Sequence, residues 1–198
     1  MHEVLALFAG TEVFIFVFME ITARVETIQR VMVKKGSWRD ILVFVLTFGA
    51  FSIFGTYAGI PLPSGAIVNI RDFAPMVAGL TAGPLIGLYV GLIGGVHRLF
   101  LGGFTCVSCG LATILAGVIG GAVHFFNKGK LPNMLQGILL AVFVELVHGG
   151  LTLLIARPFA DALEVVKTAI PAMMVANGLG LAIAIIILEH TKALRKSI

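Results

Sequence analysis

The sequence predicts an all-α integral membrane protein with seven crossings. Of its 198 residues, 59% are hydrophobic and only 12% are charged, whereas about a quarter of the residues in a soluble domain carry a charge. Apolar stretches alternate with short polar segments along the whole chain, and a spanning helix takes about 20 apolar residues. The net charge of +4 comes from the polar segments and reports orientation. No basic run is interleaved with aromatic residues, so we expect no nucleic-acid partner.

The apolar stretches define the expected elements in chain order. The first stretch lacks a basic leader region and an A-x-A cleavage pattern, and it carries Glu12 and Glu20. We therefore expect a retained N-terminal transmembrane helix rather than a signal peptide. The six later stretches form an expected six-helix core over residues 41–190. The stretches lie at 4–23, 41–60, 67–81, 84–101, 110–126, 134–156 and 168–189.

Four polar connections separate these stretches. The segment 24–40 is basic and contains Trp38, which is placed as an anchor at the membrane interface. PLPSG at 61–65 and NKGKLPN at 127–133 are predicted turns. ARPFADALEVVK at 156–167 is a predicted short polar connection.

The region 67–101 is either one long helix or a hairpin that turns at Ala82-Gly83-Pro84. Proline inside a helix costs roughly 3 kcal/mol, which favours the hairpin. The hairpin also places the basic residues of 24–40, 127–133 and 190–198 on one side, five, two and three of them, against four on the other. Basic loops stay in the cytoplasm. The predicted orientation therefore has the N-terminus outside and the C-terminus inside.

This topology gathers polar residues of the central region at the outer face. They flank the expected hairpin, and glycines at 79, 83, 87, 91 and 95 let another helix pack closely against it. The residues are Asn69, Arg71 and Asp72 before the hairpin, and His97, Arg98, Thr105, Cys106, Ser108 and Cys109 at its close.

Arg71 and Arg98 have two interpretations. Both could extend to lipid headgroups or water, and Asp72 could neutralise Arg71. Alternatively, they bind one carboxylate together, because the planar guanidinium group suits bidentate hydrogen bonding. Ionisable groups between long apolar runs usually face a cavity or a partner.

Cys106 and Cys109 form a C-x-x-C pair, which could line a ligand pocket, form a disulfide or bind a metal, in that order of preference. The segment GGFTCVSCG also opens the 110–126 helix, so its backbone N–H groups are expected to face an anion.

His97, His124 and His148 are scattered along apolar helices and form no metal-ligand motif, so we expect packing roles and no metal or cofactor. His97 alone adjoins the two arginines and could tune their pH response. Glu145 and Asn177 lie well inside apolar runs. An interhelical hydrogen bond explains either residue, and Asn177 could instead contact the ligand from the last helix.

The central region resembles the membrane-sensor module of LytS-type histidine kinases and YhcK-type cyclases. The resembling pieces are VNIRDFAPMVAGLTAGPLIGLYVGLIGGVHR, LGGFTCVSCGLATILAGVIGG and IPAMMVANGLGLAI, within residues 41–190. The resemblance implies a fold similar to the six-helix solute-binding S components of vitamin-uptake transporters. It also implies sensing of a small extracellular carboxylate such as pyruvate, with Arg71, Arg98 and Cys109 at the family's binding positions.

The expected function is a multi-pass receptor of a prokaryotic plasma membrane that signals through its C-terminal helix to a cytoplasmic domain or partner. Receptors of this kind are expected to form homodimers. The alternative is a transporter, or its solute-binding subunit, for a small anion. No nucleophile–base pair or metal constellation is visible, so no enzyme activity is expected of this chain. After Glu189 only HTKALRKSI remains, so we expect either a stand-alone module or a receptor cut off after its last span, and any kinase or cyclase activity would need a further domain. The expected divisions are 1–40, 41–190 and a cytoplasmic tail at 191–198.

Overall fold

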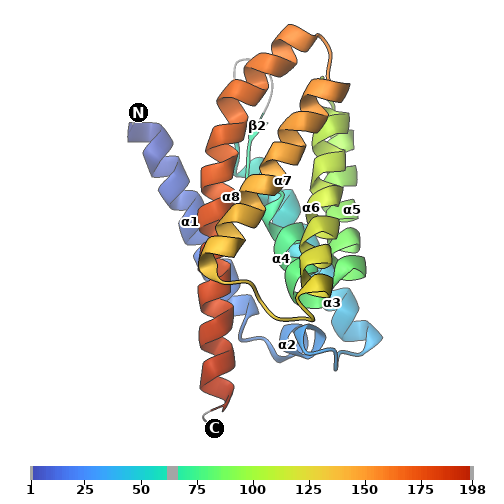
Figure 1. Ribbon diagram of the computed structural model, residues 1–198, viewed down its shortest axis with the longest axis vertical. Coiled ribbons are helices and arrows are strands. Elements are labelled where there is room, and N and C mark those ends of the chain that lie inside the picture. The colour runs from blue at the N-terminus through green and yellow to red at the C-terminus, as the bar shows by residue number, and fades with distance from the viewer. Residues whose placement is uncertain (1, 62–66, 197–198) are drawn as a thin grey trace.

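The computed structural model describes residues 2–61 and 67–196, almost all of them in helices (Figure 1). Residues 62–66, which include most of the predicted PLPSG turn, lie outside the described part. Two short strands pair in antiparallel fashion, Ile60 with Val68 and Pro61 with Ile67. The elements are α1 (His2–Thr22), α2 (Glu26–Met32), α3 (Trp38–Tyr57), β1 (Ile60–Pro61), β2 (Ile67–Val68), α4 (Phe73–Ala82), α5 (Pro84–Phe100), α6 (Cys106–Phe126), α7 (Met134–Ile155) and α8 (Phe159–Lys196).

Four helices of the described part are long and apolar enough to cross a membrane: α3, α6, α7 and α8. Two further apolar helices are shorter, α4 with 10 residues and α5 with 17. The predicted all-α membrane class is confirmed. The sidedness of the bundle and the division into a six-helix core plus one additional helix stay predictions.

The predicted hairpin is confirmed at Gly83. This residue has φ +100°, a conformation that favours glycine, and it ends α4. Pro84 then opens α5 at its first position, where proline's missing N–H has no helical partner to lose. Lys34, which follows α2, lines one cavity together with Ala82 at the end of α4 and with Lys128, so two of the basic segments lie at the same end of the bundle. Figure 1 places the C-terminus there as well.

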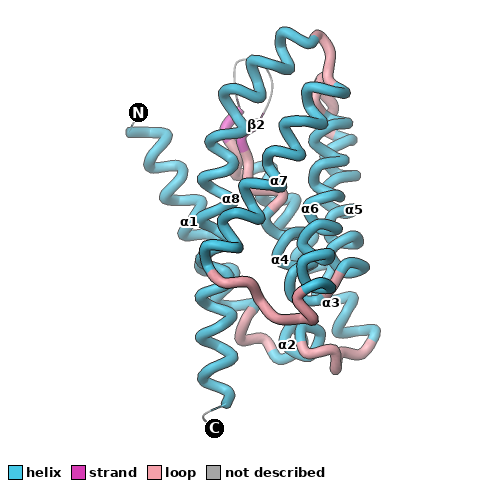
Figure 2. Tube along the Cα trace, viewed as in Figure 1, coloured by secondary structure: helices cyan, strands magenta, loops and turns pink. Residues whose placement is uncertain are grey.

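The first half of the hairpin differs from the prediction. The stretch 67–81 was expected to be helical, but α4 begins only at Phe73, and residues 67–72 form β2 and a turn. At about 1.5 Å per residue, α4 is about 15 Å long and does not cross a bilayer. Figure 2 shows the non-helical segment running among the helices. Its polar residues therefore enter the interior of the bundle rather than staying at the outer face.

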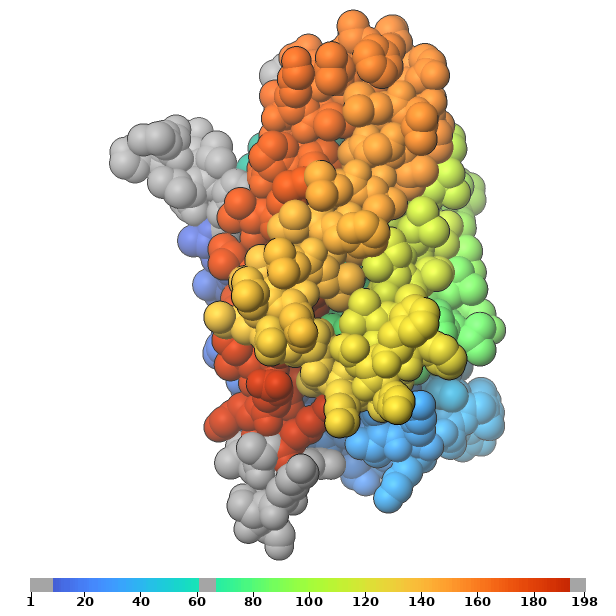
Figure 3. Space-filling view, viewed as in Figure 1, coloured from blue at the N-terminus to red at the C-terminus, as the bar shows by residue number. Residues whose placement is uncertain are grey.

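The last helix is longer than predicted. The segment 156–167 was expected to be a polar connection, but α8 begins at Phe159 and continues through Pro171 to Lys196. Only Ala156–Pro158 connect α7 to α8. Residues 159–167 are helical because one face of this segment is buried, at Ala162 and Val165. Its polar side chains lie on the other face of the helix. Figure 3 shows α7 and α8 packed along the visible face.

The basic segment 24–40 contains a helix that the sequence did not predict. Arg30 of α2 binds Asp40 at 2.6 Å, and Asp40 forms a capping box with Ser37 at the start of α3. The hydrogen bond with Asp40 raises the pKa of Arg30 above its ordinary value. Trp38 is 70% exposed, as an interfacial anchor requires.

Glycines bring α4, α5 and α6 into backbone contact. A Cβ atom at Gly87 would overlap backbone atoms of Gly117 and Gly79, and one at Gly95 would overlap the Gly110 carbonyl. The expected packing role is confirmed, although the break at Gly83 divides the glycines between two helices. The N-terminal helix joins the same core: Ile15 and Met19 of α1 are fully buried.

Candidate functional site

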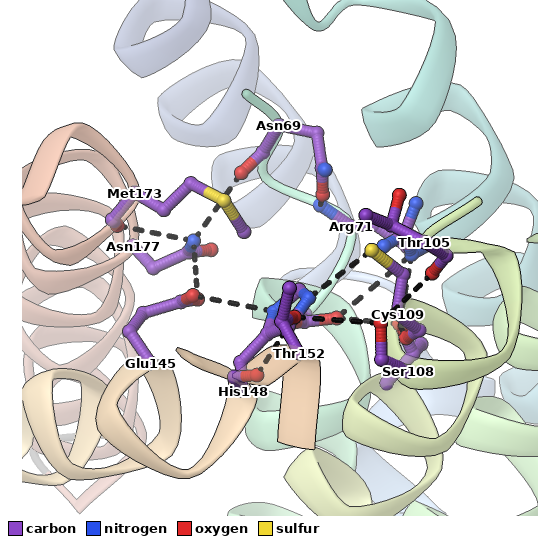
Figure 4. A network of polar contacts seen from close by, with 12 residues as sticks. Asn69, Arg71, Thr105, Ser108, Cys109, Glu145, His148, Thr152, Met173 and Asn177 are labelled. Atoms are coloured by element: carbon purple, nitrogen blue, oxygen red, sulfur yellow. Dashed lines mark hydrogen bonds and ion pairs between the residues drawn. The ribbon is translucent and has the colours of Figure 1, made fainter. Parts of the chain in front are cut away.

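A continuous network of buried polar side chains occupies the interior between α4, α6, α7 and α8 (Figure 4). Its residues come from the segment before α4, the loop between α5 and α6, and the middle of three long helices. Because burying an unpaired polar group in an apolar interior costs free energy, the partners of each residue show how the network is built.

Arg71 is fully buried in the turn between β2 and α4. Its Nε donates to Thr113 Oγ1 at 2.7 Å, and its Nη1 donates to Thr56 Oγ1 at 3.3 Å. The backbone is held in place by Asn69 Oδ1, which accepts from Arg71 N at 3.0 Å, and by Ser52 Oγ, which donates to Arg71 O. Nη2 has no partner among the described residues. This N–H group of a buried cation is therefore available to an additional hydrogen-bond acceptor.

Asp72 connects Arg71 to α7. Its Oδ1 lies 3.9 Å from Arg71 Nε and accepts from Thr113 Oγ1 at 2.6 Å. Its Oδ2 lies 2.9 Å from His148 Nδ1. The expected neutralisation of Arg71 by Asp72 is thus present. Because the turn is not helical, the same carboxylate also reaches His148.

His148 lies between two elements that the sequence does not connect. Its Nε2 lies 3.3 Å from Cys109 Sγ at the start of α6, opposite the Nδ1 contact with Asp72. Glu145, one turn earlier on α7, has its Oε2 3.5 Å from the same Nδ1. The histidine therefore links an acidic residue to a thiol.

Glu145 extends the network to α8. Asn177 Nδ2 donates to Glu145 Oε1 at 2.9 Å and also approaches the carbonyl groups of Met173 and Asn69. The expected interhelical hydrogen bond of Glu145 and Asn177 is confirmed, since each is the other's partner. Asn177 Oδ1 and Glu145 Oε2 accept no hydrogen bond from any described residue.

Arg98 closes the other side of the site. It is only 3% exposed; its Nη1 donates to Gly102 O at 2.5 Å and its Nη2 to Thr105 Oγ1 at 3.2 Å. Neither Arg98 nor Arg71 extends to lipid headgroups, which contradicts that interpretation of the two residues.

The structure brings together seven of the eight predicted ligand-binding residues. Ser108 Oγ donates to Thr105 O at 3.0 Å, and Thr152 of α7 donates to Ser108 at 3.4 Å, which joins this loop to the network. His97 is the exception, since its Nε2 contacts Tyr57 Oη at 3.2 Å. The seven are Asn69, Arg71, Arg98, Thr105, Ser108, Cys109 and Asn177.

Several members of the network were missing from the predicted site: Thr56, Asp72, Thr113, Glu145, His148 and Thr152. His148 was expected to be a packing residue, yet it lies at the centre of the network. A signal was available, because Glu145, His148 and Thr152 recur at helical spacing within an apolar stretch. The sequence does not show which helix this polar face meets.

Asp72, Glu145 and His148 place ligand-type atoms within 4.8 Å of one another. Both ring nitrogens of His148 already face protein partners, so we interpret the cluster as a hydrogen-bonded network. The absence of a metal stays a prediction, which elemental analysis of the purified protein tests. Cys106 and Cys109 are free thiols, so the disulfide interpretation of the C-x-x-C pair does not apply to this structure.

Comparisons with known proteins agree with this architecture. The family model described as 5TMR of 5TMR-LYT matches residues 25–191. The chain is 35% identical over 154 residues to the sensor histidine kinase BtsS of Escherichia coli K12, covering 75% of this chain and 27% of BtsS. It is 30% identical over 177 residues to the sensor protein LytS of Bacillus cereus, covering 80% of this chain and 29% of LytS.

A third relative is the sensor histidine kinase YpdA of Escherichia coli K12, 32% identical over 142 residues, with 69% of this chain and 24% of YpdA covered. The chain therefore spans less than a third of the length of these relatives. No solved structure matches the chain.

Proposed function

This chain belongs to the 5TMR-LYT family of membrane sensor modules, and we propose that it binds a small carboxylate between Arg71 and Arg98 and signals through α8. It is a multi-pass protein of a bacterial cell membrane. The observation that carries the ligand proposal is that Nη2 of the fully buried Arg71 has no hydrogen-bond partner among the described residues. Its removal from water is favourable only when an anion or a hydrogen-bond acceptor compensates it.

The surroundings of Arg71 favour a small, planar anion. A carboxylate accepts two parallel hydrogen bonds from a guanidinium group. The second arginine is held by Gly102 and Thr105, and Thr105 in turn accepts from Ser108 of the same network. Thr105 and Ser108 supply hydroxyl groups nearby. We propose the short carboxylates as the ligand class, with pyruvate as the test compound.

Signalling follows from the connection between Arg71 and α8. The chain of contacts runs from Arg71 through Asp72, His148 and Glu145 to Asn177. A ligand shifts a conformational equilibrium only if it binds the two states unequally. An anion on Arg71 competes with Asp72 for the guanidinium group, so it changes the charge balance at His148 and Glu145. A cytoplasmic domain of the kind found in the sensor kinases would receive the resulting shift of α8.

The proposal predicts that Arg71→Gln and Arg98→Gln each weaken pyruvate binding by at least about tenfold, because a charge-assisted hydrogen bond contributes about 1.5–3 kcal/mol. Isothermal titration calorimetry on the detergent-purified chain measures the affinity. Arg157→Gln is the matched control, since Arg157 bonds only to main-chain carbonyl groups at the end of α7. Unchanged affinity in both site variants would reject the proposal.

Arg71→Lys separates the loss of binding from a loss of folding. Lysine retains the positive charge but cannot donate from a planar fork, so we expect intermediate affinity and near-normal thermal stability. Flux of labelled pyruvate into proteoliposomes distinguishes a receptor from a transporter, because a receptor binds the ligand without moving it across the bilayer.

A further inference from the structure

Cys109, His148 and Asp72 are arranged in one line of contacts: the thiol on α6, the imidazole on α7 and the carboxylate before α4. Sγ lies 3.3 Å from Nε2, and Nδ1 lies 2.9 Å from Oδ2. This is the geometry by which a nucleophile, its base and the residue that orients the base are recognised. Along the chain the three residues follow in the order Asp72, Cys109 and His148. They lie far apart in the sequence, so no local motif predicts their contact.

The partners of His148 determine its tautomer. Asp72 Oδ1 already accepts from Thr113, and Oδ2 and Glu145 Oε2 both face Nδ1. Because the Asp72 carboxylate beside Arg71 accepts hydrogen bonds when ionised and lies nearer than Glu145, Nδ1 carries the proton in the neutral ring. Nε2 then has a free lone pair directed at Cys109 Sγ, and it is available to remove the thiol proton.

The position of Cys109 favours the thiolate in two further ways. The residue lies in the first turn of α6, where the helix dipole stabilises negative charge. The charged and titratable side chains around the pair are Arg71, Asp72, Arg98 and Glu145, from the turn before α4, from α5 and from α7. In Figure 4 the Cys109 sulfur lies on the Arg71 side of the network.

We propose that Cys109 is a nucleophile that adds reversibly to the carbonyl carbon of a 2-oxo carboxylate held by Arg71. His148 removes the thiol proton, a bond forms between Sγ and the carbonyl carbon, and the electron pair of the C=O π bond moves to oxygen. That oxygen takes the proton from His148, so a hemithioketal forms with no leaving group and no oxidant. Asp72 is the positioning residue for His148. This inference rests on the proposed anion site and narrows its ligand class.

Cys106 provides an internal control for the thiol. It lies one turn earlier in α6 and is partly exposed like Cys109, but its thiol has no hydrogen-bond partner within the described part of the chain. We expect iodoacetamide to alkylate Cys109 at least about tenfold faster than Cys106 near pH 7, as measured by peptide mass spectrometry. His148→Gln should remove the difference, in keeping with the size of base catalysis in proteins.

The pH profile tests the role of Asp72. In Asp72→Asn the amide can offer an N–H group to the ring, which disfavours the tautomer with a free Nε2. We expect the alkylation of Cys109 to require higher pH in this variant, while the profile of Cys106 stays unchanged. Thermal unfolding of each variant checks that the bundle is intact. Equal rates at the two cysteines in the unmodified chain, or a Cys109 rate independent of His148, would overturn the triad.

The covalent step is tested with pyruvate labelled with ¹³C at the carbonyl carbon. We expect its resonance to move from the carbonyl region to that of a tetrahedral carbon on binding, and to stay in the carbonyl region with Cys109→Ser. Propanoate lacks the 2-oxo group, so it should bind the unmodified chain more weakly than pyruvate does. It should bind the unmodified chain and the Cys109→Ser variant with equal affinity.

The outcomes separate the two proposals. Equal binding of pyruvate and propanoate with no tetrahedral signal overturns covalent addition and leaves the anion site in place. Absence of binding by either carboxylate overturns both proposals. A tetrahedral signal that persists in Cys109→Ser places the bond elsewhere and overturns the assignment to Cys109.

Discussion

Arg71 shows how a charge is tolerated inside this apolar bundle. The residue is fully buried, and an isolated charge in such surroundings is strongly unfavourable. Asp72 supplies a negative charge 3.9 Å away, and hydroxyl groups of Thr113 and Thr56 accept from two of its nitrogens. The compensation is incomplete at Nη2, which has no partner among the described residues, so we expect the carboxylate to accept its first hydrogen bond there. The terminal nitrogens of Arg98 both have partners, so we expect Arg98 to contribute mainly its positive charge to the same ligand.

The contact between Asn177 and Glu145 is testable at the level of single residues. Asn177→Ala removes the donor at 2.9 Å and leaves Glu145 Oε1 without a partner. We expect a loss of about 1–2 kcal/mol in the free energy of unfolding, near the upper end for polar contacts between membrane helices. Denaturant titration in detergent measures it.

Thr168→Ala is the matched control on the same helix. Thr168 Oγ1 bonds only to carbonyl groups of its own helix, chiefly Glu164 O at 2.9 Å, so we expect a change within about 0.5 kcal/mol. An equal effect of the two substitutions would show that Asn177 contributes no interhelical contact.

Among the elements, α6 organises the site because α4 and α5 both pack on its glycine face. Gly117 and Gly87 face each other so closely that a Cβ atom on either would overlap the other's backbone. α5 carries Arg98, whereas α6 begins at Cys106 and carries Cys109 and Thr113. The separation of these two helices therefore determines how the arginine and the thiol are placed.

Gly117→Ala should separate α5 from α6. We expect it to reduce stability by about 1–3 kcal/mol, as overpacked cores do, and to weaken carboxylate binding as well. Gly150→Ala on α7 is the control, since a Cβ atom there has no neighbour within 4 Å. It should be neutral or stabilising by up to about 1 kcal/mol, because alanine favours the helix over glycine. Thermal unfolding distinguishes them, and an unaffected Gly117→Ala chain would contradict the packing argument.

At the scale of the whole molecule, α8 connects the site to the end of the bundle where the basic segments lie. About 30 Å of helix separates Asn177 from Lys196, at 1.5 Å per residue. The relatives of this chain are longer sensor proteins, and under the proposed function α8 would transmit a shift at Asn177 towards this end of the bundle.

The predicted orientation gives a labelling test. In a chain with both native cysteines replaced by serine, Asp161→Cys near the start of α8 should react with a membrane-impermeant maleimide in intact cells. Lys130→Cys, in the loop between α6 and α7, should react only after permeabilisation. Both side chains are exposed, so a difference in labelling reports the side of the membrane and not burial. Labelling of Lys130→Cys but not of Asp161→Cys in intact cells would contradict the predicted orientation.

The sequence by itself determined the helical membrane class and the hairpin at Gly83, and it identified Arg71, Arg98 and Cys109 as site candidates. These depend on composition, on proline and glycine chemistry and on the distribution of charge, which are local properties. The hydrophobic pattern gave wrong predictions at 67–72, which are not helical, and at 159–167, which are. In both segments, contacts with the rest of the bundle determined the backbone conformation.

Only the tertiary structure placed His148 between Asp72 and Cys109, since the contact depends on how α7 lies against α6 and the turn before α4. The positions of Glu145, Thr113 and Thr152 depend on the same packing. A polar residue in an apolar helix needs a partner, but its sequence neighbours do not identify that partner. The rotation and depth of each helix are properties of the whole bundle, and they decided which buried groups meet.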